Sequence, residues 1–216
     1  MKSVLVIGMG RFGQHIAMKF EELGNEVMAV DISEEKINEI LPKVTSAQIG
    51  DCTKEPVLRS IGVGNFDICI VAVGNNFQSS LEITLLLKEL GAQKIIAKAS
   101  RDIHAKFLMR SGADEVIYPE KEMAEKAAVR YNARNVFDYI ELTPEYSVFE
   151  ITPMDSWINK TIEQVAVRTK YHISILATKI GDNIRPLPKP DHVFTHEEHL
   201  IVFGRKEDVF KFTKRI

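Results

Sequence analysis

The stretch VLVIGMGRFGQHIA, Val4–Ala17, contains the pattern that decides the fold. Gly8, Gly10 and Gly13 match G-x-G-x-x-G, with a β-rich apolar run before them and a helix-like segment after them. In such a loop the first glycine permits a tight turn, the second lets the backbone approach a pyrophosphate, and the third lets helix and strand pack closely. The N-terminus of the helix then faces the anion. The stretch therefore predicts a nucleotide-binding βαβ unit.

Short apolar runs alternate with helix-length amphipathic segments through the first 119 residues. Strands are predicted at 3–8, 26–31, 45–50, 66–74, 94–99 and 114–119, and helices are predicted to start near Arg11, Ser33, Lys54, Asn76 and Asp102. Runs that are apolar throughout are typical of parallel strands covered on both faces. The alternation predicts an α/β fold: a Rossmann-like, doubly wound parallel sheet with right-handed crossovers.

The composition changes across residues 134–153, which suggests a second, smaller unit. We expect three parts: a Rossmann-like domain at 1–118, a helix at 119–133 that begins with Pro119, and a small α+β domain at 134–216. The last should hold strands at 147–151, 173–179 and 199–204 and a helix within 159–170. With only about 80 residues its core is marginal, so it is expected to pair with a copy of itself or with a neighbour.

Charge and hydropathy exclude several classes of protein. The 216 residues carry 28 basic and 30 acidic side chains and no basic run, which argues against a nucleic-acid partner. The apolar stretches are far shorter than the roughly 18 to 20 residues of a membrane-spanning helix, and no signal-like segment follows Met1. A cytoplasmic protein is expected, and its two cysteines, Cys52 and Cys69, should be free thiols.

Several polar residues lie where a nucleotide would meet the sheet edge. Asp31 ends the second predicted strand, where a carboxylate accepts hydrogen bonds from both ribose hydroxyls and repels the 2′-phosphate of NADP. Arg11 could reach a terminal phosphate. Lys98 interrupts an apolar run, so either a phosphate or water at the strand end must be its partner. Asp51 could accept from the adenine amino group or cap the next helix, and Asn76 could simply cap the helix that follows it.

Groups for redox or hydrolytic chemistry are sparse in the sequence. None of the five tyrosines is followed four residues later by lysine, so the pair of short-chain dehydrogenases is missing. His104 is near the expected nucleotide edge, where a contact with phosphate or water is favoured over a role as general base. The sequence HEEH at 196–199 lacks the H-E-x-x-H spacing and is expected to form a solvated turn. These observations favour binding of a nucleotide over reaction with it.

Five stretches together carry a family resemblance: VIGMGRFG, EVMAVDISEEKI, AVGNNFQSSLEITLLLKELG, AKASRDIHAKFLMRSGADEVIYPEKEMA and YHISILATKIGD. The chain resembles the regulatory RCK (KTN) subunits of Trk/Ktr-type potassium uptake systems, closest to the Ktr type. The resemblance implies a Rossmann lobe that binds ATP, ADP or NAD(H), a crossover helix, and a second lobe that closes a dimer. It further implies dimers assembled into an octameric ring under a membrane-embedded potassium-translocating subunit.

The resemblance also implies which residues form the binding sites. Arg11 would contact the phosphates and distinguish ATP from ADP, and Glu120 would bind a divalent cation beside ATP. The nucleotide site would comprise Gly8, Gly10, Arg11, Phe12, Gly13, Asp31, Ile32, Ser33, Asp51, Cys52, Val73, Gly74, Asn75, Lys98, Ala99, Ser100, His104 and Glu120. Cyclic di-AMP, which only some members bind, would contact Arg168, Tyr171, His172, Ile173 and Ile175 in the second lobe. The alternative there is a packed dimer core with exposed polar edges.

The leading hypothesis is a non-enzymatic cytosolic sensor that gates a potassium channel or transporter in response to nucleotide. An NAD-dependent oxidoreductase, with its substrate held by the second lobe, is the main alternative. A soluble NAD(H) redox sensor shares the predicted fold and is the third hypothesis.

Overall fold

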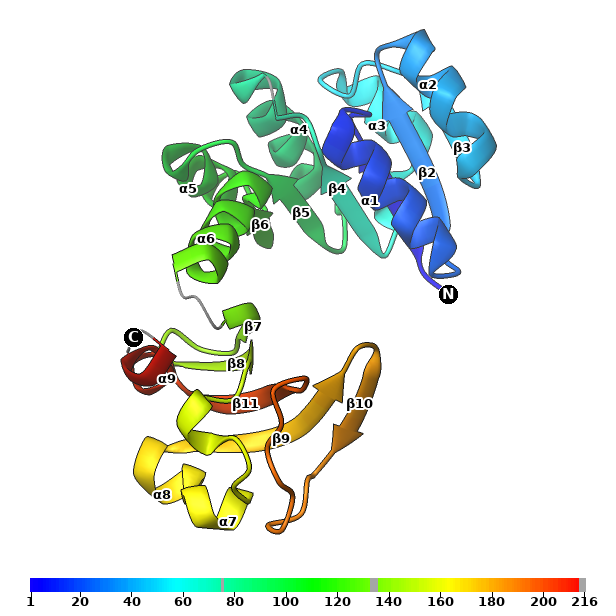
Figure 1. The fold of residues 1–216 in the computed structure, drawn as a ribbon. Coiled ribbons are helices and arrows are strands. Elements are labelled where there is room, and N and C mark those ends of the chain that lie inside the picture. Colours follow the sequence, from blue (N-terminus) through cyan, green and yellow to red (C-terminus); the bar gives the residue numbers. More distant parts are fainter. Residues whose placement is uncertain (75, 133–135, 214–216) are drawn as a thin grey trace. The chain divides into compact units, whose positions relative to one another are not determined.

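The computed structural model describes residues 1–74, 76–132 and 136–213 (Figure 1). The chain divides into two compact units, Met1–Lys121 and Glu122–Ile216. We describe each unit by itself.

The first unit is built on a parallel sheet of six strands in the order β3-β2-β1-β4-β5-β6. Its strands are β1 (Ser3–Ile7), β2 (Glu26–Asp31), β3 (Ser46–Ile49), β4 (Ile68–Val71), β5 (Ile95–Lys98) and β6 (Glu115–Ile117). Its helices are α1 (Arg11–Glu22), α2 (Glu34–Ile40), α3 (Glu55–Ile61), α4 (Phe77–Glu89), α5 (Asp102–Arg110) and the start of α6 (Pro119–Asn132), with short 3-10 turns at Leu41–Lys43 and Val63–Asn65. The predicted doubly wound parallel sheet is thereby confirmed.

Side chains of the central strands alternate between two apolar cores, one on each face of this sheet. In β1, Val4 and Val6 pack with Ala17 of α1 and with α2, whereas Leu5 and Ile7 pack with α3, α4 and α5. All four strand residues are buried, as expected for a strand that helices cover on both faces. The edge strand β3 differs, because most of its residues are exposed in spite of its predicted burial.

The second unit contains an antiparallel sheet of five strands in the order β10-β9-β11-β8-β7. The strands are β7 (Val136–Glu141), β8 (Tyr146–Ile151), β9 (Ile173–Ile180), β10 (Asn183–Pro186) and β11 (His199–Arg205). The helices are α7 (Ile162–Val165), α8 (Val167–Tyr171) and α9 (Lys206–Thr213), with a 3-10 turn at Asp155–Trp157. One face of the sheet packs with these helices around Phe149, Trp157 and Phe194, so the predicted α+β unit is also confirmed.

The single helix predicted within 159–170 is wrong in one respect. Ala166, in the left-handed region at φ 54°, divides it into α7 and α8. Val165 and Val167 are both buried. Residues two apart point to different sides of a continuous helix, so the break lets both valines reach the same core.

The prediction of a solvated turn at 196–199 holds for His196 and Glu197 and is wrong for Glu198, whereas His199 lies in the strand predicted at 199–204. His196 and Glu197 are exposed, but the Glu198 carboxylate is 1% exposed. It lies 2.8 Å from His192 Nε2 and accepts a hydrogen bond of 2.8 Å from the Thr195 backbone N–H. His199 begins β11, where Nδ1 lies 2.6 Å from Glu150 Oε1. The Glu198 carboxylate thus connects the residues before β11, and the Glu150 carboxylate contacts the first residue of β11. The local sequence does not indicate either role.

Candidate functional site

A cavity of about 850 Å³ opens at the carboxyl ends of β1, β2 and β4 and at the N-terminus of α1. The strand order reverses here, because β1 is followed in sequence by β2 on one side and pairs with β4 on the other. Doubly wound folds bind their ligands at this switch point. The volume is within the range of small-molecule and cofactor sites.

The glycine loop adopts the shape that its sequence predicts. Gly8 has φ +97°, and a Cβ there would meet Val73 and the Ala72 backbone at 3.0 to 3.1 Å. Gly10 is the N-cap of α1, with open space where a side chain would be. Gly13 lies behind the loop, where a Cβ would be 1.9 Å from the carbonyl oxygen of Gly8. The first turn of α1 thus directs its free backbone N–H groups toward the cavity.

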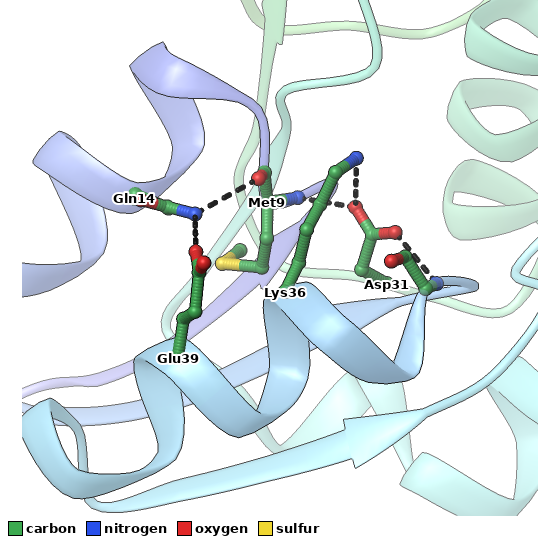
Figure 2. Close-up of polar contacts among 6 residues, drawn as sticks. Met9, Gln14, Asp31, Lys36 and Glu39 are labelled. Carbon is green, nitrogen blue, oxygen red and sulfur yellow. Dashed lines mark hydrogen bonds and ion pairs between the residues drawn. The ribbon is translucent and has the colours of Figure 1, made fainter.

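Asp31 ties the end of β2 to the glycine loop (Figure 2). Its carboxylate is 8% exposed and accepts hydrogen bonds from the backbone N–H groups of Met9 at 2.6 Å and Ser33 at 2.8 Å. Lys36 Nζ approaches the same carboxylate at 3.5 Å. A carboxylate offers about four acceptor positions, so it can still accept from a ribose hydroxyl. Asp31 therefore shapes the loop as well as lining the cavity.

One face of the segment after β2 contributes residues that the sequence analysis missed. Glu35, Lys36 and Glu39 line the cavity beside Ile32, which the family resemblance had already implied. Figure 2 shows Lys36 and Glu39 projecting from α2 toward Asp31 and Gln14, and Gln14 Nε2 lies 3.4 Å from Glu39. The available signal was the spacing of Glu35 and Lys36 relative to Glu39, four and three residues apart, since it marks one face of a helix, here α2, which begins at Glu34.

Asp51 and Cys52 line the cavity beyond β3. Asp51 does not cap α3, whose N-cap is Lys54. Its Oδ1 accepts from the Thr53 hydroxyl at 2.6 Å and from the Thr53 N–H at 3.0 Å. The hydrogen bond from the Thr53 hydroxyl has the larger effect on the pKa of Asp51, followed by that from the Thr53 N–H, and both lower it. The second carboxylate oxygen of Asp51 has the Lys54 ammonium at 3.9 Å as its ionic neighbour, which leaves room for a donor such as an adenine amino group.

Both cysteines are free thiols, as expected, and both are buried. Burial raises the pKa of Cys52 and of Cys69 from 9.0 to about 12, so the thiolate fraction of each at pH 8 falls about 1000-fold. We expect neither thiol to react with Ellman's reagent in an hour in the folded protein, and both to react at once in guanidinium chloride. Rapid reaction of one thiol before unfolding would show that Cys52 or Cys69 is accessible and ionised, contrary to this structure.

Lys98 and Glu120 form an ion pair at the wall of the cavity. Lys98 Nζ lies 2.7 Å from Glu120 Oε1, and both residues line the cavity. The hydrogen bond from Lys98 lowers the pKa of Glu120. The lysine in the apolar run thus has a carboxylate as its partner, whereas the sequence analysis expected phosphate or water. Within residues 1–74, 76–132 and 136–213, Arg11 forms no ion pair and its exposed side chain lines the same cavity.

His104 does not line the cavity, contrary to the expected contact with phosphate. Its side chain is fully buried, and Nε2 lies 2.7 Å from Ser80 Oγ. The Ser100 N–H donates to Nδ1 at 3.3 Å, which leaves the ring proton on Nε2. Burial, and then the charge of Arg101, lowers the pKa of His104. The neutral ring therefore connects α4 with the turn after β5.

The predicted nucleotide residues thus divide into two groups. Those that line the cavity are Gly8, Gly10, Arg11, Phe12, Asp31, Ile32, Asp51, Cys52, Val73, Gly74, Lys98 and Glu120. Those that do not line it are Gly13, Ser33, Ala99, Ser100 and His104. Asn75 lies outside the described residues. Asn76, whose Oδ1 accepts from the Ser79 N–H at 3.0 Å, caps α4 and also lines the cavity.

The second-lobe candidates separate by burial. Tyr171, Ile173 and Ile175 belong to the apolar core, where the Tyr171 and Trp157 rings meet edge to face at 4.9 Å. Arg168 and His172 are exposed, and His172 ends α8 with φ 57°. Only these two of the five side chains are free of the core in this unit.

Metal-ligand clusters and membrane-spanning helices are both absent from the residues that the structure describes. Among those residues, no three His, Cys, Asp or Glu side chains cluster in a way that could hold a metal ion. No helix there combines the length and the apolar character that crossing a bilayer requires.

Comparison with known proteins gives matches over both units. Residues 4–119 match the TrkA-N domain and residues 147–216 match the TrkA-C domain. The chain is 43% identical to the Ktr system potassium uptake protein C of Bacillus subtilis (strain 168), over all of this chain and 97% of that one. The structure resembles the GsuK channel bound to NAD with a TM-score of 0.68 at 17% identity, over 96% of this chain and 38% of the channel. It also resembles GsuK bound to ADP, with a TM-score of 0.54 at 17% identity, over 60% of this chain and 34% of that one.

Proposed function

The chain belongs to the family of TrkA-domain proteins, and we propose that it is the nucleotide-sensing regulatory subunit of a Ktr-type potassium uptake system. One observation carries the proposal: a chain similar over its full length to a Ktr potassium uptake protein has a cavity lined by a G-x-G-x-x-G loop and by the carboxylate that ends β2. The resemblance to GsuK, whose structures hold NAD and ADP, supports an adenine nucleotide as the ligand.

Binding and regulation follow from the charges that line the cavity. The backbone N–H groups at the start of α1 would hold the phosphates, with Arg11 as the cation that reaches a terminal phosphate. ATP and ADP can shift the protein between two shapes only if their relative affinities for those shapes differ. Arg11 would supply that difference by its contact with a third phosphate. In this proposal the residues of the cavity bind the nucleotide without reacting with it, and the nucleotide acts as a signal.

Other parts of the proposal extend the family resemblance to this chain. Residues 1–118 would form the nucleotide lobe, 119–133 the crossover helix and 134–216 the lobe that closes a dimer, with dimers forming an octameric ring beneath the membrane-embedded subunit. Glu120 would bind a divalent cation beside ATP. Arg168 and His172, exposed beside the core, would be the polar contacts for cyclic di-AMP.

The function is tested by titrating ATP, ADP, NAD and NADH into the protein and measuring potassium flux through vesicles that hold its membrane partner. We expect ATP and ADP to bind and to change the flux by different amounts. Each nucleotide should also be incubated with hydroxy and carbonyl compounds. Tightest binding of NADH together with its oxidation by a carbonyl compound would overturn the proposal and favour an oxidoreductase.

A further inference from the structure

The ammonium group of Lys98 is held in a narrow position inside the cavity. Its side chain is only 15% exposed, and Nζ lies 5.8 Å from the centroid of the Phe12 ring. The Lys98 side chain runs beside Gly74. A Cβ at Gly74 would be 3.4 Å from Lys98 Nζ and 3.5 Å from Lys98 Cδ. Among the residues that the structure describes, its ionic partner is Glu120 alone, at 2.7 Å. Lys98 therefore has little freedom to move away from the cavity.

The two members of the pair differ in mobility. The Glu120 side chain is 62% exposed, so its carboxylate can turn into water at small cost, whereas the confined lysine cannot follow it. Any ligand phosphate near Nζ would meet a site where an acceptor is already in place. Such a phosphate must displace Glu120 or share the lysine with a second negative charge.

We propose that Glu120 competes with the phosphate of the ligand for Lys98, so that this ion pair lowers affinity only for ligands whose phosphates reach the lysine. The inference rests on the proposed function, since it concerns the same nucleotide site. It makes Glu120 a specificity-determining residue even when no metal ion is present. A ligand with one phosphate leaves the pair undisturbed, whereas a triphosphate that reaches Lys98 must displace Glu120 or share the ammonium group with it.

The test is calorimetric titration of ATP and AMP in the presence of a chelator, with wild-type protein and Glu120→Gln. We expect Glu120→Gln to bind ATP about tenfold more tightly, the scale of one charge-assisted hydrogen bond, and AMP within about twofold of wild type. Asp102→Asn is the matched control. It removes the same charge and an ion pair of 2.9 Å, to Lys121 in the same turn of α6, but Asp102 does not line the cavity.

A second pair of variants separates competition from simple repulsion. If Glu120 only repels phosphate through space, Glu120→Gln should improve ATP binding equally in wild-type and Lys98→Gln protein. If Glu120 competes for Lys98, the improvement should disappear in the Lys98→Gln background, because nothing remains to compete for.

The inference is overturned if Glu120→Gln binds ATP no more tightly than wild type under chelation, or if it gains equally without Lys98. Absence of all adenine-nucleotide binding would instead overturn the proposed function. In that case inorganic tripolyphosphate, titrated into the same variants, still decides the inference. Tighter binding to Glu120→Gln supports it, and equal or undetectable binding to both proteins refutes it.

Discussion

Gly13→Ala is expected to lower the free energy of unfolding of the first unit by about 3 kcal/mol or more and to abolish nucleotide binding. A methyl group at this position would lie 1.9 Å from the Gly8 carbonyl oxygen and 3.2 Å from the Ala72 Cβ. The oxygen belongs to the backbone, so α1 and the loop must move apart. The better helix propensity of alanine recovers only about 1 kcal/mol. Thermal unfolding followed by circular dichroism and nucleotide titration measure the two effects.

Gly10→Ala is the matched control for this prediction. Gly10 has φ −73° and ψ −179°, which alanine adopts without strain, and no atom lies within 4 Å of the added methyl group. We expect the stability to change by less than about 0.5 kcal/mol and nucleotide affinity to fall, because the methyl group faces the path of the phosphates. Equal stability of the two variants would show that Gly13 is not held against Gly8 as described.

Asp31→Asn should reduce nucleotide affinity about 100-fold and destabilise the first unit by about 3 kcal/mol. The carboxylate accepts from two backbone N–H groups, on Met9 and Ser33. An amide has one oxygen, so one of these donors would face an NH₂ group instead. The same change removes the negative charge that we propose accepts hydrogen bonds from the ribose hydroxyls. Urea unfolding and nucleotide titration at a temperature where the variant is folded measure the two losses.

Glu39→Gln is the control for Asp31→Asn, since Glu39 also lines the cavity but is exposed. Among the residues with described positions, its one hydrogen-bonding partner is Gln14, at 3.4 Å. Its stability should stay within about 0.5 kcal/mol of wild type. Wild-type affinity in Asp31→Asn would remove Asp31 from the binding site. Wild-type stability of Asp31→Asn would mean that the hydrogen bonds from Met9 and Ser33 to Asp31 contribute nothing to the free energy of unfolding.

The sequence predicts the first unit well because its signals are local. Each parallel strand is a short apolar run, and the three glycines specify both the turn and the helix behind it. The second unit is harder to read. In β7 only Val136 and Tyr139 are buried, and the edge strand β10 is exposed throughout, so neither shows the alternation that marks a strand.

The parts of the site that the sequence misplaces depend on partners distant in the chain. Lys98 and Glu120 were both expected near the phosphates, but their pairing joins residues 22 apart and needs β5 and α6 to be adjacent. His104 has a polar ring that suggests a ligand contact, yet Ser80, 24 residues earlier, is its buried partner. Spacing along one segment contains no information on such pairs.

The double role of Asp31 limits how a nucleotide-insensitive form of this protein could arise. Each substitution that removes the proposed contact of Asp31 with the ribose also removes support for the glycine loop, so the variant loses stability and cellular abundance before its response to nucleotide changes. Cavity residues without such structural bonds, such as Glu39 and Arg11, are free of this penalty. Substitutions that change which ligand binds should therefore accumulate first at exposed cavity residues such as Glu39 and Arg11. Asp31 should be among the last positions to change.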